Sequence, residues 1–580
     1  MKLATLLAVA LPLSALAQDP PRVREYDVDA LVRSIPDRGA PYLGMLLGAS
    51  VDGVPEPELE PASDVEFPAM SGDSLLPLVT ALTGVEWDEE KDSLEVTPQR
   101  KLLVNAPDEI HRRVARIVST LLARLAPEIA VDATLVEIRA GVLGEIVSGV
   151  PAVLPDERTA RLQDAIRQGA DAGGLRRLRL VARPLHLAHV KSVEETAYLA
   201  DVDLVAAGEK PAYTSVTASV RTGSTLEVRA HLFDGAVVLD WRLADARLDG
   251  AHDAIETVGG TQIQMPRVRR RSMSGELLVP NTATAFAGAV VAAGKPGWVL
   301  ALFLRPQVEA PASKEKPWEP EGAMVTAVHP VSALCATGDG DAPMRMTGDD
   351  LVNLVMSTVE PGEWDDATGA AISFNDGVLV AHNTPAVQKK LAAFLAERRR
   401  DLAPVAVEFK LVRATAGALG EAALGESLSA RTIEKLLAKA ATGDGASVAW
   451  EAVVSSSTRR PMAVDDRTRR PIVAAYPVDS GAPDPQLGVA EWGARLALTP
   501  VAPEKAGGRI GLRAFKLEFA TAVEPFAKAA ASGKLEIHLP KVATAGFAAE
   551  SDLEPGVWTS LGMATQGDAT LVLLARATAP

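Results

Sequence analysis

The sequence predicts an α+β protein in which a small α-β-β-α unit followed by a β-rich domain occurs twice. The stretch SGDSLLPLVTALTGVEWDEE, which begins at Ser71, returns as TGDDLVNLVMSTVEPGEWDDA from Thr347. Further along, IAVDATLVEIRAGVLGE from Ile129 aligns without gaps on VAVEFKLVRATAGALGE from Val405. With 47% hydrophobic and 23% charged residues, the chain has the composition of a globular protein. Together these observations predict a tandem repeat of folded units.

The repeat and the composition divide the 580 residues into six segments. A chain of this length exceeds the size at which one hydrophobic core keeps growing, so several domains are expected. The stretch PQVEAPASKEKPWEPEG is rich in Pro, Glu and Lys, which is typical of an extended linker. The expected segments are a signal peptide at 1–17, an opening strand with the first α/β unit at 18–125, a first β-rich domain at 126–305, the linker at 306–322, a second α/β unit at 323–401 and a second β-rich domain at 402–580.

The first residues have the features of a secretory signal peptide. Lys2 precedes a short apolar run, and Ala15-Leu16-Ala17 supplies a small-x-small cleavage site before Gln18. No later stretch reaches about 18 uninterrupted apolar residues, so no transmembrane helix is expected in the mature chain. We therefore expect an exported protein, with the periplasm as its location and the outer membrane as the alternative.

Cysteine content and charge narrow the class of protein further. Cys335 is the single cysteine, so the folded chain cannot contain an internal disulfide and must be stabilised by burial. The formal net charge is −16 at pH 7, which argues against nucleic acid as a partner.

Each predicted α/β unit begins with an amphipathic helix. The first helix follows Ser71, a favourable N-cap residue, and the second follows Thr347, which forms a capping box with Asp350. The apolar residues fall at helical spacing in both copies. They are Leu75, Leu78, Val79 and Leu82 in the first copy and Leu351, Leu354, Val355 and Val359 in the second.

A short hairpin and a second helix complete each unit. The hairpins are SLEVTPQRKLLVN and AISFNDGVLVAHN, and the second contains the tight-turn signal Asn375-Asp376-Gly377. The second helices carry one apolar stripe each, and these stripes should be buried against the hairpins. The stripes are Ile110, Val114, Ile117 and Leu121 in the first copy and Val387, Leu391, Phe394 and Leu395 in the second.

The β-rich segments also correspond along their length. Each has a helix, ERTARLQDAIRQGADAGG or ARTIEKLLAKAATGDG, and then alternating strands. TGSTLEVRA matches WGARLALTP with Gly223 opposite Gly493, and the final strands WVLALFLR and ATLVLLAR also pair. The pattern predicts two β-rich bodies with the same element order.

This order of elements resembles the secretin family, the outer-membrane channel components of type II and type III secretion systems. The resemblance rests on an α-β-β-α unit followed by ATLVEI, LRLVARP, GSTLEVRA, DGAVVLDWRL, a Pro-x-Val-x-Arg strand and a Val-Pro-Asn stretch that ends at Gly288. It implies secretin N-type units that build rings, a secretin-like β-rich domain and a role in the cell envelope. The second half diverges more, with Arg413 where the first has Glu137.

Two departures from the family pattern shape the functional hypothesis. Secretins insert membrane-spanning hairpins after the strand that corresponds to ATLVEI, whereas VLGEIVSGVPAVLP is too short for strands of about 9–11 residues each. Two bodies in one chain are also atypical. We therefore expect a non-enzymatic, exported secretin-like scaffold or interaction protein, with peripheral envelope association left open. The alternatives are a true secretin subunit that forms an outer-membrane ring, and a secreted enzyme with an unrecognised site.

No catalytic, cofactor-binding or metal-binding residue is predicted. The loop with Gly288, Gly294 and Lys295 has Pro296 where a phosphate-binding loop requires Ser or Thr. His186 and His189 lack the further ligands of a metal site, and TGDGDAP lacks those of a calcium loop. The acidic runs Asp88-Glu89-Glu90 and Glu194-Glu195 are expected to be solvated. The expected partners are therefore other proteins or further copies of the chain, bound through the α/β units and the sheet edges.

One dense basic run, RVRRRS, is the remaining candidate site. In a strand, Arg267, Arg269 and Arg271 share one face and could bind an anionic partner. The alternative is a solvated strand edge, where such charges guard against pairing with another sheet.

Overall fold

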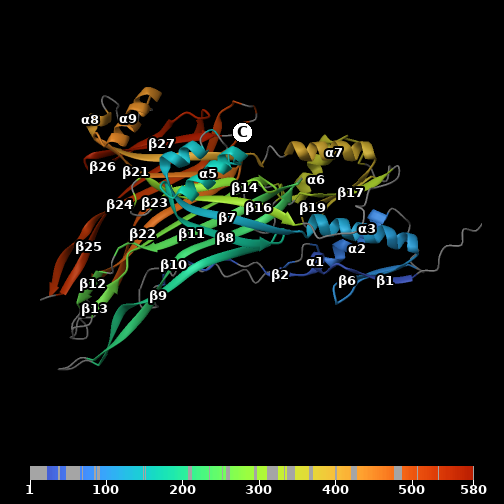
Figure 1. The fold of residues 1–580 in the computed structure, drawn as a ribbon, viewed down its shortest axis with the longest axis horizontal. Coiled ribbons are helices and arrows are strands. Elements are labelled where there is room, and N and C mark those ends of the chain that lie inside the picture. The colour runs from blue at the N-terminus through green and yellow to red at the C-terminus, as the bar shows by residue number, and fades with distance from the viewer. Residues whose placement is uncertain are drawn as a thin grey trace, which may run out of the picture.

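The computed structural model describes residues 22–36, 39–46, 66–67, 70–83, 87, 92–147, 149, 152–206, 212–233, 235–250, 253–256, 262–292, 295, 297–309, 324–331, 333–335, 346–364, 370–375, 377–398, 402–419, 428–475, 486–503, 505, 507–532 and 535–578. The α/β units lie together at one end of the molecule, and long strands fill the other end (Figure 1). Below, the first half means the described residues up to 309, and the second half means those from 324 onward. The predicted signal peptide lies outside the described residues.

The first α/β unit is a three-stranded sheet covered by helices. Its elements are β1 (Arg22–Asp27), α1 (Asp29–Val32), α2 (Gly72–Thr83), β5 (Ser93–Val96), β6 (Lys101–Ala106) and α3 (Asp108–Leu125), and the strand order is β1-β6-β5. The predicted stripe of α3 is buried in the core of this unit. The short strands β2 (Ile35–Pro36) and β4 (Glu66–Phe67) pair nearby.

The second α/β unit has the corresponding strand order, β17-β19-β18. Its elements are β17 (Val325–Pro330), α6 (Gly348–Thr358), β18 (Ala371–Asn375), β19 (Val378–Asn383) and α7 (Pro385–Glu397). The capping box predicted at Thr347 and Asp350 is confirmed. The two units pack on each other, because Val328 and Val378 from the second sheet belong to the same buried cluster as Leu75 of α2.

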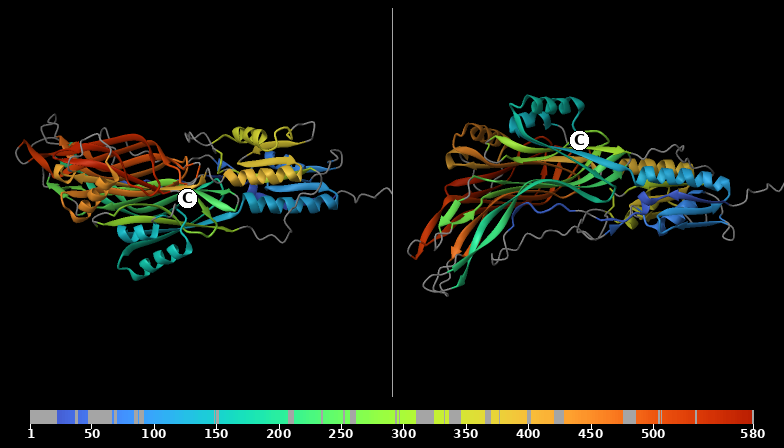
Figure 2. Two further views of the ribbon diagram at one scale, coloured as in Figure 1. Left: turned by 90° about the horizontal axis from the view of Figure 1, so that it is seen from above. Right: turned by 60° about the horizontal axis from the view of Figure 1, so that its bottom comes forward.

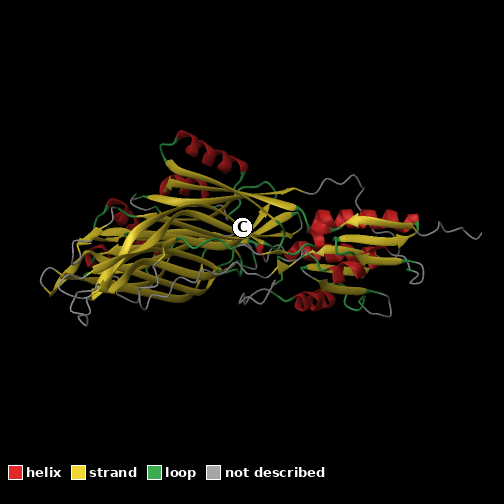
Figure 3. Ribbon diagram, turned by 90° about the horizontal axis from the view of Figure 1, so that it is seen from below, coloured by secondary structure: helices red, strands yellow, loops and turns green. Residues whose placement is uncertain are grey.

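Two large sheets form the body of the molecule. Their strands are yellow in Figure 3. In the described part of the chain, the eight-stranded sheet has the order β26-β27-β20-β21-β15-β16-β7-β8. Its strands are β7 (Glu128–Arg139), β8 (Ala172–Ala182), β15 (Ala285–Val291), β16 (Trp298–Glu309), β20 (Pro404–Ala414), β21 (Ala446–Ser457), β26 (Thr559–Gln566) and β27 (Ala569–Thr578). The four strands from each half therefore stand as adjacent blocks in the same internal order.

The nine-stranded sheet repeats this arrangement. Its main path is β25-β24-β23-β22-β14-β11-β10-β3, and β9 also pairs with β10. Its strands are β3 (Gly44–Leu46), β9 (Leu187–Ala206), β10 (Ala212–Phe233), β11 (Ala236–Leu248), β14 (Val268–Pro280), β22 (Met462–Ala475), β23 (Gln486–Val501), β24 (Ile510–Ser532) and β25 (Leu535–Leu553). The strands β12 (Asp253–Glu256) and β13 (Gln262–Met265) form a separate pair.

A single core lies between the two sheets and includes both halves. Trp241 and Leu302 from the first half share this buried cluster with Phe409 and Leu496 from the second. The two segments predicted as separate β-rich domains are therefore one body. The predicted start of the linker at 306 also differs, because β16 pairs with β7 as far as Glu309. Pro306 fits there because β15 pairs only as far as Leu304 and does not need its N–H.

Helices cover the outer face of the eight-stranded sheet at two places. The first half contributes α4 (Ala140–Val147) and α5 (Asp156–Gln168), which stand on the outside of the body in cyan in Figure 2. The second half contributes α8 (Ala416–Leu419) and α9 (Ala430–Thr442). Leu143 and Leu162 pack on the first block, and Leu419 and Leu436 pack on the second.

Candidate functional site

The two halves meet where strands of different halves pair. In the nine-stranded sheet, Val268–Ser274 of β14 pair antiparallel with Arg469–Ala463 of β22. In the eight-stranded sheet, Gly288–Val290 of β15 pair antiparallel with Val454–Ala452 of β21. These four strands are called the junction below. Since β14 pairs with β11 on its other side, it is not a sheet edge.

Two arginines of the predicted basic patch are engaged inside the junction. Nε and Nη2 of Arg269 donate to the two carboxylate oxygens of Asp466, each at 2.8 Å. Nε of Arg271 lies 3.7 Å from Oδ1 of the same carboxylate. The side chain of Arg271 is 2% exposed, so it cannot form part of an outer patch. Arg267 precedes β14, so the patch predicted for an external anionic partner is not assembled on one face of a strand.

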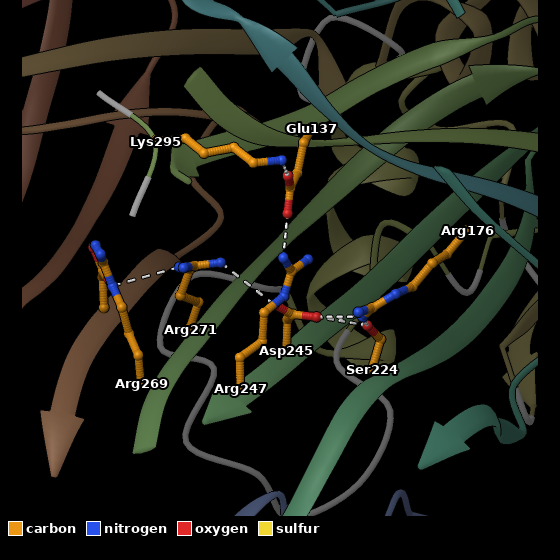
Figure 4. A network of polar contacts seen from close by, with 9 residues as sticks. Glu137, Arg176, Ser224, Asp245, Arg247, Arg269, Arg271 and Lys295 are labelled. Carbon is orange, nitrogen blue, oxygen red and sulfur yellow. Dashed lines mark hydrogen bonds and ion pairs between the residues drawn. The ribbon is translucent and has the colours of Figure 1, made fainter. Parts of the chain in front are cut away.

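A polar network continues from Arg271 on β14 to Glu137 on β7, a strand of the other large sheet (Figure 4). Nη1 of Arg271 donates to Asp245 at 3.4 Å, and the same carboxylate accepts from Ser224 Oγ at 2.7 Å and from Arg176 Nη1 at 2.5 Å. Arg247 donates to Asp245 at 3.2 Å.

Glu137 is the second acid of this network. Arg247 joins the two acids, because it also donates to Glu137. Nζ of Lys295 donates to Glu137 at 2.5 Å. Both acids are nearly inaccessible, with side chains 1% exposed for Asp245 and 2% for Glu137.

The balance of burial and pairing sets the charges in this network. Burial disfavours ionisation of Glu137, but the hydrogen bonds from Lys295 and Arg247 outweigh this effect and lower its pKa. Burial and repulsion by Arg269 lower the pKa of Arg271 to about 10. Both groups are therefore charged at neutral pH.

A buried ion pair links the junction to the second α/β unit. Nε of Arg460 donates to Oε1 of Glu276 at 2.9 Å, and the two side chains are 8% and 4% exposed. Nη2 of Arg460 donates to the backbone oxygen of Ala333 at 3.1 Å. Ser456 accepts a hydrogen bond from the backbone N–H of Glu276 at 3.0 Å. These contacts fix β14 against the second half.

Glycines allow the junction strands to approach closely. A Cβ atom at Gly275 would lie 2.9 Å from the backbone oxygen of Ser455. A Cβ atom at Gly288 would lie 3.0 Å from the backbone oxygen of Val453. The glycine that suggested a phosphate loop in the sequence therefore has a packing role.

The other residues considered for chemistry do not gather in one place. Lys295 pairs with Glu137, His186 precedes β9 while His189 lies within it, and Glu195 accepts from Arg221 at 2.9 Å on the surface. Within the described ranges, no group of three or more His, Cys, Asp or Glu side chains is arranged to hold a metal ion. Asp88, Glu89, Glu90, Gly294, Pro296 and all of TGDGDAP lie outside the described residues.

Asp245 and Asp466, which each hold more than one arginine of the network, were not predicted as site residues from the sequence. Each interrupts a strand of alternating pattern at a position that faces the sheet interior. A charged residue at such a position is a signal for a buried ion pair. The partner of Asp466 could not be predicted from the sequence, because Arg269 belongs to the other half of the chain.

The body ends in strands that pair on one side only within the described residues. One end consists of β8 and β9, and the other of β25 and β26. Exposed apolar side chains lie on two of these strands. They are Leu175 (39% exposed) and Val181 (54%) on β8, and Leu539 (47%) and Val542 (37%) on β25. Such edges are templates for strand addition.

Comparisons with known proteins give similarities at low identity. No protein-family model and no curated protein matches the sequence. ExeD from Aeromonas hydrophila is 13% identical, and the match covers 88% of each chain with a TM-score of 0.21. The InvG secretin domain from the Salmonella SPI-1 injectisome is 11% identical over 51% of this chain and 90% of that chain, with a TM-score of 0.22.

A third similar structure is the type II secretin GspD from enteropathogenic Escherichia coli. It is 13% identical over 41% of this chain and 84% of that chain, with a TM-score of 0.20. Identities of this size concern the fold alone, and TM-scores near 0.2 add no argument to it. Among the helices that the structure describes, none combines the length and apolar character needed to cross a bilayer.

Proposed function

We propose that this protein is a non-enzymatic structural subunit that assembles head to tail, each chain supplying two successive copies of one secretin-like building block. The observation that carries the proposal is the junction itself. Inside one chain, the β14–β15 side of the first half pairs with the β21–β22 side of the second half. The two sides of this contact are different surfaces, so repetition of the contact produces a ring or a filament.

The two outer ends supply the surfaces for such repetition. By strand order, β25 and β26 occupy in the second half the places of β14 and β15, and β8 and β9 occupy in the first half those of β21 and β22. The end formed by β25 and β26 should therefore pair with the end formed by β8 and β9 of another copy.

Matching glycines support this correspondence. A Cβ at Gly223 would lie 2.1 Å from the backbone oxygen of Ser192 on β9, and a Cβ at Gly493 would lie 2.1 Å from that of Asp466 on β22. Both glycines have a positive φ, 122° and 127°. The same close approach of two strands thus occurs in each half. Ser192 therefore occupies in the first half the position that Asp466 occupies in the second.

The correspondence fixes the register expected between two copies. At the junction, Arg270 of β14 lies opposite Arg467 of β22. Arg270 lies opposite Ala246, which lies opposite Gly223. Thr544 of β25 lies opposite Ala520, which lies opposite Gly493. Thr544 is therefore the counterpart of Arg270. The counterpart of Arg467 on β9 is Val193, the residue after Ser192. Thr544 of one copy is therefore expected opposite Val193 of the next.

Engineered cysteines test this register. The variant Cys335→Ser/Thr544→Cys/Val193→Cys should form a ladder of covalent multimers on non-reducing gels and return to monomer with reductant. Opposed residues of antiparallel strands have Cα atoms about 4.5–5.5 Å apart, which suits a disulfide that spans about 4.4–6.8 Å.

The matched control moves one cysteine four residues along β9, in the variant Cys335→Ser/Thr544→Cys/Ala197→Cys. This displacement exceeds 10 Å at roughly 3.3 Å per residue, so it should prevent the cross-link. Equal ladders from both variants would show non-specific oxidation, and no multimer from the first would refute head-to-tail pairing.

The envelope role is proposed from the secretin resemblance of the sequence and the predicted signal peptide. Fractionation of cells that produce the full chain should recover the protein in the periplasmic fraction. Recovery only from detergent-extracted outer membrane, as a heat-resistant multimer, would favour the true secretin subunit instead.

A further inference from the structure

A hollow of about 610 Å³ lies on the outer face of the first half, between α5 and strands β7, β8 and β16. Its apolar lining comes from Leu162 and Ile166 of α5 and Phe303 of β16. A hollow of this size and lining is suited to a bound side chain or small ligand.

Four arginines surround this apolar lining. They are Arg167, Arg177, Arg179 and Arg305, and the acid in the lining is Asp132. Oδ1 of Asp132 lies 3.6 Å from Nε of Arg179, with both side chains more than a third exposed. The rim therefore has an excess of positive charge on a chain whose net charge is −16. Guanidinium groups favour carboxylates, which they can bind with two parallel hydrogen bonds.

The second half shows what occupies the corresponding place. Arg305 lies opposite Asp132 in the pairing of β16 with β7, as Arg576 lies opposite Glu408 in the pairing of β27 with β20. The guanidinium carbon of Arg576 lies 4.9 Å from the ring centroid of Trp558, which is the geometry of a cation–π contact.

The first half lacks this tryptophan. Gly288 and Gly562 correspond, because they hold the same place in the register with the next strand. Thr284 lies four residues before Gly288 and Trp558 lies four residues before Gly562. Thr284 therefore stands where the second half has Trp558. Thr284 lines the hollow beside Arg305. The first half thus keeps the arginine that stacks on the ring in the second half and leaves the place of the ring open.

We propose that this hollow binds an acidic segment of a partner protein, with one aromatic side chain of the segment over Arg305 and its carboxylates on the arginine rim. This goes beyond the head-to-tail assembly, because it concerns the outer face of β7, β8 and β16 and not the pairing of the free edge of β8 with another copy. The cleft at the junction, about 570 Å³ between α4 and the outer face of the second half, remains open although the two halves are paired. The hollow should likewise remain accessible in an assembly.

Binding of a labelled peptide to the full mature chain tests the proposal. The probe is fluorescein-Asp-Glu-Trp-Asp-Glu, followed by fluorescence anisotropy at physiological salt. It should bind at least tenfold more tightly than the same peptide with Ala in place of Trp, and a Lys-Lys-Trp-Lys-Lys peptide should not bind. Equal binding of the Trp and Ala peptides would refute the aromatic part of the proposal.

Variants locate the binding. Thr284→Trp places the ring of the second half in the hollow and should weaken binding of the Trp peptide at least tenfold, whereas Thr442→Trp on the exposed end of α9 should not. Arg305→Ala should weaken binding similarly, and the exposed control Arg509→Ala should not. Unchanged binding to Thr284→Trp and Arg305→Ala would place the peptide elsewhere and refute the proposal.

Two further readouts distinguish peptide binding in the hollow from chain assembly and from binding to a membrane. Thr284→Trp, introduced into the cysteine variant Cys335→Ser/Thr544→Cys/Val193→Cys, should still give the covalent ladder, so loss of peptide binding and loss of assembly are distinguishable. Displacement of the peptide by anionic phosphatidylglycerol vesicles, with neutral vesicles inert, would overturn the proposal in favour of a membrane surface.

Discussion

Asp466 pairs with two arginines of β14, Arg269 and Arg271. Arg269 has 22% of its side chain exposed and Arg271 has 2%, and both point to this carboxylate. We expect Asp466→Ala to lower the free energy of unfolding by about 3–5 kcal/mol, because removing one member of a buried pair leaves uncompensated charge. Urea denaturation measures the change. Asp552→Ala, which removes the exposed partner of Arg513, should change stability by less than about 1 kcal/mol. Equal effects of both substitutions would contradict the role given to Asp466.

Glu137 should make the stability of the body sensitive to acid. Its pKa is lowered in the folded chain, so its contribution is complete above the unfolded value of about 4.3 and is lost as the pH falls toward the folded value. Urea midpoints at pH 7 and pH 3.5 should therefore differ less for Glu137→Gln than for the unaltered chain. The exposed substitution Glu109→Gln should leave the difference unchanged. An unchanged difference in Glu137→Gln would contradict the prediction.

At the residue scale, the basic run could be recognised in the sequence, but its role could not be predicted. Alternation placed Arg269 and Arg271 on one face of a strand, and the structure retains this relation. Whether that face meets solvent or a carboxylate depends on which strand lies next to β14. The answer is β22, nearly 200 positions away, and no local pattern encodes that pairing.

At the scale of single elements, the amphipathic helices should carry much of the stability of the α/β lobe. Ile117 of α3 is 1% exposed and Phe394 of α7 is 9% exposed. Ile117→Ala and Phe394→Ala should each lower the free energy of unfolding by about 2–5 kcal/mol, because each removes buried apolar surface and leaves a cavity. Thermal and urea unfolding measure the change. Met356→Ala, at an exposed position of α6, is the control and should change little; a similar loss in all three would contradict the assignment.

These helices could be predicted because their signals are local. The apolar spacing of 3.6 residues, the cap at Thr347 and the turn before Gly377 each depend on a few neighbouring residues. Strand ends were less predictable. Pro306 indicated the start of a linker, yet β16 continues past it because only one neighbour requires hydrogen bonds there. The limits of a strand thus depend on partners that the segment itself does not reveal.

At the scale of the whole molecule, the sequence repeat predicted matching element orders but not a shared interior. Alternation shows which face of a strand is apolar, and it does not show which other strand or sheet covers that face. The two β-rich segments were therefore predicted as two domains. In the structure, Trp241 and Phe409 belong to one cluster, so the halves bury each other as parts of one sandwich.

The covalent link between the halves has a consequence for symmetry. Within one chain, the contact between the two halves is held by the peptide chain and by the ion pair of Arg269 with Asp466. The next contact along an assembly forms between two chains. On β25 and β9 the counterparts of these residues are Ala543 and Ser192, so the second kind of contact cannot contain the same ion pair. A closed ring of such chains contains an even number of halves. Its contacts within chains alternate with contacts between chains, and the two kinds differ in strength. The order of its rotational symmetry is therefore half the number of halves in the ring.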